Sequence, residues 1–333
     1  LFSQEALSAA VSAGTMSWAP VFFFAGLAAI SEVFVAQNNG ANRLKEIPRY
    51  VWQMIWLGIA SILVYLPLAW FFTPCIFGST EVLEQTYYRY MLYFGPIVTI
   101  MYALSSFYIG RGRAGTITLL TVAGNLINLM LDPLFIFGYR DWIPSMGIKG
   151  AAIATGIGYT FQCLILFYLF LRKCNRNIYQ THHWHFNWSK FKSCLRIGLP
   201  SSVCITIELL GWGLCYWLIA KTSAFNLLVV GVCQSILFPF LSYGLGLEKG
   251  AAAITGNLIG ANKRYLVHKV IQSGVLLCAI FAIVIWVAFV GFPDYLIQWF
   301  IHTPGAMEHV TTQTFDIASL LPVLELGLVF LGV

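Results

Sequence analysis

A single carboxylate stands near the middle of one long apolar segment of this chain. Glu208 lies midway between Arg196 and Lys221, the basic residues that bound the segment. On a membrane helix this position is close to the centre of the bilayer, where an ionised side chain is costly and faces water, an ion or a polar partner. Binding of a proton or a cation is the chemistry that fits such a group. The alternative is a protonated glutamate that only stabilises packing against a neighbouring helix.

Two further acids share the last apolar segment, with a proline between them. Asp316 and Glu325 are about two and a half helical turns apart, so they would point to opposite faces of a straight helix. A bend at Pro322 changes that geometry, because proline distorts a helix and frees a carbonyl. Glu325 lies deeper in the segment and is the second candidate for cation binding. Asp316 is left open between a cavity and a solvated margin.

A polar stripe marks another segment. Asn125, Asn128 and Asp132 have the spacing i, i+3, i+7, which places them on one face of a helix. Such a stripe either lines a cavity or hydrogen-bonds adjacent helices. Gln234, in a later segment, is a further candidate for lining a cavity. Glu32 lies near the basic end of its segment, and we interpret it as a group that snorkels or caps a helix.

The elements that must hold these residues are membrane helices. Hydrophobic residues make up 59% of the 333 and charged residues only 10%, with a mean hydropathy of +0.78. Soluble domains carry about 25% charged residues. The net charge of +6 comes from basic residues in short loops, a pattern typical of membrane proteins rather than of nucleic-acid binding. No P-loop, HExxH or GxSxG motif is present, so we expect no enzyme activity, no metal and no cofactor.

Nine apolar segments are long enough to span a bilayer, which takes about 20 residues. The chain is therefore predicted to be an all-α polytopic membrane protein. It begins and stops within this pattern, and we expect a fragment cut at both ends. The segments lie between residues 5 and 32, 49 and 81, 89 and 111, 149 and 172, 221 and 248, and 269 and 294, and over residues 114–137, 197–220 and 310–333.

Lysine and arginine are concentrated in alternate loops, which the positive-inside rule assigns to the cytoplasm. We therefore expect the protein to span the inner or plasma membrane of the cell. The longest of these loops, residues 173–195, carries the histidine cluster His182, His183 and His185. Without cysteine or acidic partners, this cluster is interpreted as part of a solvated loop and not as a metal site.

The two halves of the chain resemble each other at an offset of 220 residues (260 − 40). Gly40-Ala41-Asn42-Arg43 recurs as Gly260-Ala261-Asn262-Lys263, and both copies end an apolar segment at the cytoplasmic side. Parallel repeats of this kind occur in secondary transporters. We therefore expect two parallel pseudo-symmetric helical lobes, residues 1–172 and 196–333, joined by the cytoplasmic loop 173–195.

Several motifs, in order along nearly the whole chain, resemble the multidrug and toxic compound extrusion (MATE) family. The segment Asn-Leu-Met-Leu-Asp-Pro-Leu-Phe-Ile-Phe-Gly resembles its fifth-to-sixth helix signature, and Ala-Gln-Asn-Asn-Gly-Ala resembles a motif after its second helix. Gly-Leu-Pro followed by Glu208 resembles the opening of its second half. The resembling segments are residues 36–41, 128–138, 146–155, 198–200 and 255–261. Gln234 falls where members of the family often carry a His-Gln or similar pair.

The resemblance implies twelve helices in two six-helix lobes around a central cleft, with nine spans visible here as the second to the tenth. It implies a monomeric antiporter in the lipid bilayer that exports small organic, often cationic, compounds against Na⁺ or H⁺ entry. Glu208 matches an acid of the seventh helix used for cation coupling in several members. Glu325 falls within about a residue of the matching acid on the tenth helix.

Two other functions are compatible with a membrane protein of this kind. A lipid-linked oligosaccharide flippase of the same superfamily would need a basic cavity for pyrophosphate, and no lysine or arginine lies in the middle of a predicted span. An integral membrane transferase would need acids or histidines clustered at one membrane face, whereas the acids here are spread over separate segments.

Overall fold

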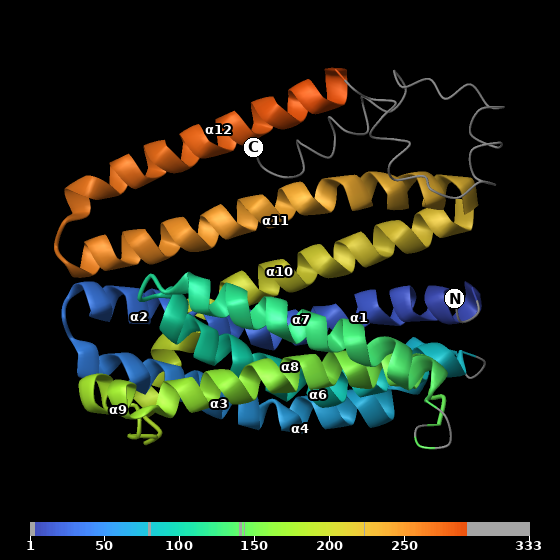
Figure 1. Cartoon of the computed structure of the whole chain (residues 1–333), viewed down its shortest axis with the longest axis horizontal. Coiled ribbons are helices and arrows are strands. Elements are labelled where there is room, and N and C mark those ends of the chain that lie inside the picture. The colour runs from blue at the N-terminus through green and yellow to red at the C-terminus, as the bar shows by residue number, and fades with distance from the viewer. Residues whose placement is uncertain (1–3, 79–80, 140–141, 143, 223, 292–333) are drawn as a thin grey trace. The chain divides into compact units, whose positions relative to one another are not determined.

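The structure is a computed structural model, which describes residues 4–78, 81–139, 142, 144–222 and 224–291, with some side chains in these helices left out. The described residues form helices and no β-strand (Figure 1). The helices are α1 (Gln4–Ala29), α2 (Ser31–Gly40), η1 (Leu44–Glu46), α3 (Ile47–Ala60), α4 (Ile62–Pro67), η2 (Leu68–Phe72), α5 (Thr73–Ile76), α6 (Val82–Ile109), α7 (Ala114–Phe137), α8 (Ile148–Leu171), α9 (Lys173–Tyr179), α10 (Trp188–Thr222), α11 (Ala224–Gly260), η3 (Arg264–Leu266) and α12 (Val267–Gly291).

Among the residues searched, 7 helical segments are long and apolar enough to cross a membrane. Consecutive short helices merge into some of them, so α1 and α2 share one span, and η1 to α5 share another. The predicted span between residues 221 and 248 is helical within α11, and that over 310–333 lies outside the described residues. The prediction of an all-α polytopic membrane protein is confirmed. The spans are Ser12–Gly40, Leu44–Ile76, Val82–Ile109, Ala114–Phe137, Ile148–Leu171, Trp188–Cys215 and Arg264–Val287.

The span Leu44–Ile76 changes its winding where proline enters it. Pro67 has no amide hydrogen to donate, and the five residues that follow, η2, form a π-helical turn. The hydroxyl of Thr73 donates to the carbonyl of Ala69 at 2.8 Å and to that of Leu68 at 3.2 Å. A side-chain donor thus satisfies carbonyls that the wider turn leaves free.

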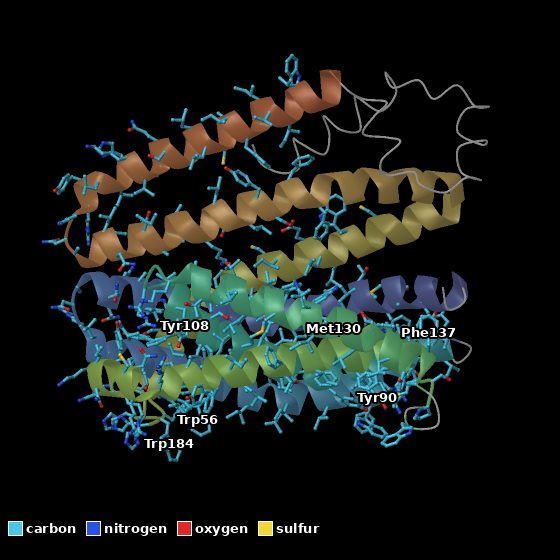
Figure 2. The ribbon with its side chains drawn as sticks, viewed as in Figure 1. Trp56, Tyr90, Tyr108, Met130, Phe137 and Trp184 are labelled. Carbon is cyan, nitrogen blue, oxygen red and sulfur yellow. The ribbon has the colours of Figure 1, made fainter. Side chains whose placement is uncertain are left out.

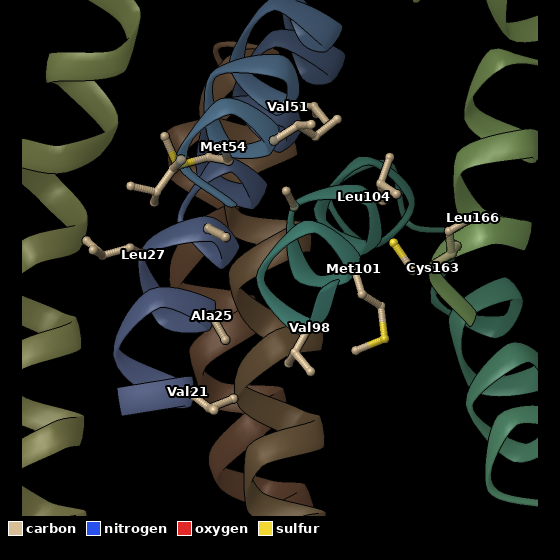
Figure 3. Close-up of a cluster of buried hydrophobic side chains, with 14 of the residues drawn as sticks. Val21, Ala25, Leu27, Val51, Met54, Val98, Met101, Leu104, Cys163 and Leu166 are labelled. Carbon is tan, nitrogen blue, oxygen red and sulfur yellow. The ribbon is translucent and has the colours of Figure 1, made fainter. Parts of the chain in front are cut away.

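The helix α6 is the centre of the packing in the first part of the chain. It lies against α1, α3 and α8, while α7 packs on α8 and α10 on α1. Met54, Leu104 and Leu166 are fully buried where these helices meet (Figure 3). Lipid is as apolar as these side chains, so close van der Waals fit rather than removal from water holds the helices together.

Small residues allow that close fit. A methyl group added at Gly95 of α6 would lie 2.7 Å from the ring of Tyr65 in α4. The hydroxyl of Tyr65 donates to the carbonyl of Pro20 in α1 at 3.3 Å, so one tyrosine ties three helices together.

Contacts divide the chain into two compact units. One contains residues 1–223 and 245–274, and the other contains residues 224–244 and 275–333. In the second unit, the rings of Tyr243 and Phe281 stack with centroids 3.7 Å apart, which joins α11 to α12. The division into lobes at 1–172 and 196–333 stays a prediction.

Candidate functional site

The repeat seen in the sequence is also a repeat of backbone structure. At the end of α2, Ala41 N donates to the carbonyl of Gln37 at 3.0 Å; at the end of α11, Ala261 N donates to that of Asn257 at 2.9 Å. The next residue in each copy adopts the left-handed conformation, with φ of 57° at Asn42 and 61° at Asn262. Asparagine tolerates this conformation better than most residues. A short 3₁₀ helix, η1 or η3, follows each turn.

A third copy of the same turn ends α6. Gly112 has φ of 74°, and Arg113 N donates to the carbonyl of Tyr108 at 2.9 Å, as Arg43 N does to that of Asn38 at 2.8 Å. The sequence Gly-Arg-Gly-Arg did not reveal this copy, because glycine replaces asparagine at the left-handed position. The three turns share a left-handed backbone conformation at one position, although the residue type at that position differs.

Two of these helix ends hold a third through one asparagine. Asn39 Nδ2 donates to Asn257 Oδ1 at 2.7 Å, and Asn257 Nδ2 donates to the carbonyl of Gly110 at 2.7 Å. Asn257 thereby joins the ends of α2, α6 and α11. We call Asn39, Asn257 and Gly110 the asparagine junction.

Glycines on each side of the junction bring the backbones of the two repeats into contact. A methyl group at Gly40 would overlap the carbonyl oxygen of Asn257, and one at Gly260 would overlap that of Gln37. The two contacts are equivalent under the offset of 220 residues, since 37 + 220 = 257 and 40 + 220 = 260. The repeats therefore contact each other reciprocally at their basic ends.

A buried acid lies in α2 ahead of the junction. Glu32 is only 6% exposed, and its Oε1 has no hydrogen-bond partner among the described residues. Glu248 and Lys249 of α11 are its charged neighbours. The interpretation of Glu32 as a snorkelling or capping group is wrong, because its carboxyl neither reaches the surface nor caps α2. Glu32 lies more than two helical turns before Gly40, the last residue of α2, so the sequence already indicated that it is not at the end of the span.

The residues predicted to couple cations are only partly described. Glu208 lies within α10, and its side chain is exposed. Gln234 lies within α11, but its side chain is outside the described set, as are Asp316 and Glu325 entirely. A pairing of Glu208 with Glu325 stays a prediction.

The polar stripe of α7 contacts α8. Asn128 Nδ2 donates to Asp132 Oδ1 at 3.4 Å and to Thr155 Oγ1 of α8 at 3.3 Å, while Asn125 is exposed. A methyl group at Gly124 would overlap the side chain of Gln162, so the helices are close at this level. The bond from Asn128 to Thr155 is an interhelical hydrogen bond of the kind that one reading of the stripe predicted, whereas the bond to Asp132 lies within α7. A role of the stripe in lining a cavity stays a prediction.

The histidine cluster shows ring contacts. The rings of His182 and His183 have centroids 4.0 Å apart. Within the described part of the chain, no group of three or more His, Cys, Asp or Glu residues is arranged to hold a metal ion.

The fold and the asparagine junction define an all-helical integral membrane protein built from two parallel repeats that meet at their basic ends. Residues 1–134 and 200–332 match the family model described as MatE. The chain belongs to the MatE family.

Curated relatives share low but extended similarity. The probable multidrug resistance protein NorM of Agrobacterium fabrum is 24% identical over 315 residues, which cover 89% of this chain and 65% of that protein. The protein of the same name from Bacillus subtilis is 27% identical over 210 residues, covering 60% and 46%. The chain thus spans less than two thirds of the length of both relatives.

Solved structures share the fold. A MOP superfamily transporter from Pyrococcus furiosus superposes with a TM-score of 0.76 at 19% identity, covering 92% of this chain and 68% of that one. The eukaryotic MATE transporter AtDTX14 superposes with a TM-score of 0.76 at 17% identity, covering 93% and 70%. The prediction of two parallel helical lobes is confirmed by this likeness.

Proposed function

We propose that the protein is a secondary active antiporter that exports small organic, often cationic, compounds in exchange for Na⁺ or H⁺. The observation that carries the proposal is the reciprocal contact of the two repeats at the asparagine junction. A transporter of this architecture works by opening its cleft alternately to the two sides of the membrane. Membership of a family whose relatives are named multidrug resistance proteins supports the substrate class.

The junction has the properties of a gate on the basic side, which the positive-inside rule assigns to the cytoplasm. Its two hydrogen bonds from Asn39 and Asn257 each contribute about 0.5–1.5 kcal/mol net. Together these hydrogen bonds stabilise the closed conformation enough to populate it. They are still weak enough for the few kcal/mol that separate two conformations to shift the equilibrium towards the open one.

Coupling requires that an ion and the exported compound each bind the two states with different affinity. Glu208 and Glu325 are the proposed cation-binding residues, as expected from their match to the family. Glu32 adds a third acid, because opening the junction beside it would let water reach its buried carboxyl. A hydrated carboxylate carries its charge at far lower cost than a buried one. Protonation and gate opening would then be linked at this residue.

The test is export of ethidium from vesicles that contain the full-length protein, under imposed Na⁺ or pH gradients. Glu208→Gln removes the charge but keeps the size of the side chain, so we expect active export to fall at least tenfold while membrane insertion is unchanged. Glu81→Gln is the control, because Glu81 is an exposed acid outside the spans. Normal gradient-driven export by Glu208→Gln would rule out this role, and no ethidium export by the wild type would rule out the substrate class.

A further inference from the structure

The segment between α9 and α10 is held against helix α3 rather than left free in solvent. Trp52 Nε1 donates to the carbonyl of Thr181 at 2.8 Å, and Trp56 Nε1 donates to that of Trp184 at 3.1 Å. Gln53 Nε2 donates to the carbonyl of His185 at 3.1 Å. The rings of Trp56 and Trp184 lie side by side, with centroids 6.0 Å apart (Figure 2). Three side chains on little more than one turn of α3 therefore fix the path of residues 181–185.

These contacts place the segment at the level where a span meets the membrane surface. Trp52 and Trp56 belong to the span Leu44–Ile76, and Leu171 is the last residue of the span Ile148–Leu171. Arg172 and Lys173 follow at once. Tryptophan and basic residues gather at the depth of the lipid headgroups, where one end of the side chain is apolar and the other is wet.

An open pocket of about 250 Å³ lies at this level, lined by Trp52, Leu171, Arg176, His182 and Trp184. Two indole rings and a leucine supply apolar walls. The guanidinium of Arg176 and the imidazole of His182 supply hydrogen-bond donors. A guanidinium presents a planar pair of N–H donors that matches two phosphate oxygens, and no carboxylate lines the pocket to compete for it.

The positive charge of the surrounding segment is unbalanced. No aspartate or glutamate occurs between Asp141 and Glu208, a stretch that contains the basic residues of the segment 172–196. Glu46 of η1 is already paired with Arg49, at 2.5 Å between Nη1 and Oε1, and with Lys190. Arg176 takes part in neither of the two ion pairs found in the described residues. The pocket thus combines a free cation with apolar walls.

Exposed aromatic side chains continue from the pocket along the segment. Trp184 is 58% exposed, and Phe186 and Trp188 beyond it are exposed as well. Large aromatic residues at a charged surface would be unfavourable in water but favourable among lipid glycerol groups and the first acyl carbons.

We propose that this pocket binds the phosphate headgroup of an anionic phospholipid from the leaflet on the basic side. Arg176 and His182 donate hydrogen bonds to the phosphate oxygens. Trp52, Leu171 and Trp184 contact the glycerol and the upper acyl chain. The charge of the segment and the apolar walls together select an anionic lipid over both a zwitterionic lipid and a free anion.

The experiment uses the full-length protein in a neutral detergent, with phosphatidylglycerol and phosphatidylcholine of equal chain length offered in equal amounts. Native mass spectrometry measures how much of each lipid stays bound. We expect the wild type to retain phosphatidylglycerol with about tenfold preference. Arg176→Gln/His182→Gln should reduce the preference to within about twofold.

Lys173→Gln/His183→Gln is the matched control. It removes the same formal charge and one histidine from the same exposed segment, but neither residue lines the pocket. We expect this variant to keep the wild-type preference. Equal loss in both variants would replace a site by diffuse surface charge and overturn the proposal. Thermal unfolding of each variant shows whether it is folded, and the single variant Arg176→Gln, at an exposed position, carries the same test if the double variant is not.

Competition with inorganic phosphate distinguishes a site for a phospholipid headgroup from a site for a free phosphate ion. Added at a large excess over lipid, it should leave phosphatidylglycerol bound, because phosphate makes none of the apolar contacts with the pocket. Complete displacement of the lipid would identify a site for a free anion, and no preference between the two lipids would also overturn the proposal.

Discussion

Two carboxyls of this protein stand in contrasting surroundings. Glu208 is exposed on α10, where lipid or a cavity can face it, whereas Glu32 is buried in α2 without a hydrogen-bond partner among the described residues. A buried charge without a partner is strongly unfavourable, so the closed junction and an ionised Glu32 oppose each other. The charged residues that act electrostatically on Glu32 are Lys249 and Glu248 of α11.

The variant Glu32→Gln tests this linkage. Glutamine keeps the size of the side chain but carries no charge at any pH, so the junction should stay closed across the pH range. The measurement is the labelling rate of Ala36→Cys, at a fully buried position of α2, by a maleimide that cannot cross the membrane, in a background without other reactive cysteines. The rate is divided by that of a free thiol with the same reagent at each pH, which removes the rise caused by thiolate formation itself. In the wild-type background this ratio should rise with pH; with Glu32→Gln it should remain low and flat.

Glu248→Gln serves as the control. Glu248 is exposed, and its substitution removes a repulsive neighbour of Glu32 rather than the buried carboxyl itself. The pH dependence should persist in this variant. A pH profile for Glu32→Gln that matches the wild type would show that another group titrates the gate.

Helix ends carry the contact between the two repeats. The ends of α2, α6 and α11 share one turn, in which a residue with positive φ reverses the chain after the last helical carbonyls. This shared geometry lets one asparagine side chain bridge three helices. Glycine at Gly40 and Gly260 brings the backbones close enough for that bridge, because any larger residue overlaps a carbonyl of the other repeat.

Two glycines of the same helix give a matched pair of variants. In Gly260→Ala the new methyl group meets the backbone of Gln37, whereas at Gly250 nothing lies within 4 Å. Alanine is the better helix former by about 1 kcal/mol, so Gly250→Ala should be neutral or stabilising. Gly260→Ala should force the junction open, raising the Ala36→Cys labelling rate and lowering the thermal unfolding midpoint. Equal effects from the two substitutions would mean that close approach at Gly260 does not hold the gate.

At the scale of the whole molecule, the two repeats are linked in sequence only through the segment 172–196, yet they meet in space at their basic ends. Asn39 and Asn257 are separated by 218 positions and share a hydrogen bond. The proposed transport by alternating access requires this contact to break and re-form in every cycle.

Covalent closure of the junction should therefore stop the cycle. We expect Asn39→Cys/Asn257→Cys, joined by oxidation or by a short bifunctional thiol reagent, to lose ethidium export, and a reductant to restore it in the oxidised protein. Each single cysteine variant should export at a rate within about threefold of the wild type, because it loses one side-chain hydrogen bond at Asn39 or three at Asn257 but leaves the junction free to open and close. Undiminished export by the fully cross-linked protein would show that the junction does not open during transport.

The sequence alone determined the class of the fold and the relation between its halves. Hydropathy and the length of apolar runs are local properties of a chain. Continuous apolar runs of this length indicate helices in lipid, because a helix satisfies its backbone donors and acceptors within the segment. The repeated Gly-Ala-Asn turn was visible for the same reason, since a positive φ restricts which residues fit. The candidate Glu208 followed from its place between two basic residues.

Only the tertiary structure decided which residues those elements bring together. The burial of Glu32, the bridge by Asn257 and the overlap that Gly260 avoids are contacts between distant positions, and no local pattern encodes how closely two helix ends approach. The same holds for the path of the segment after α9, which indole and amide donors of α3 hold against that helix. Buried backbone carbonyls require donors, and packing alone determines which side chains can reach them.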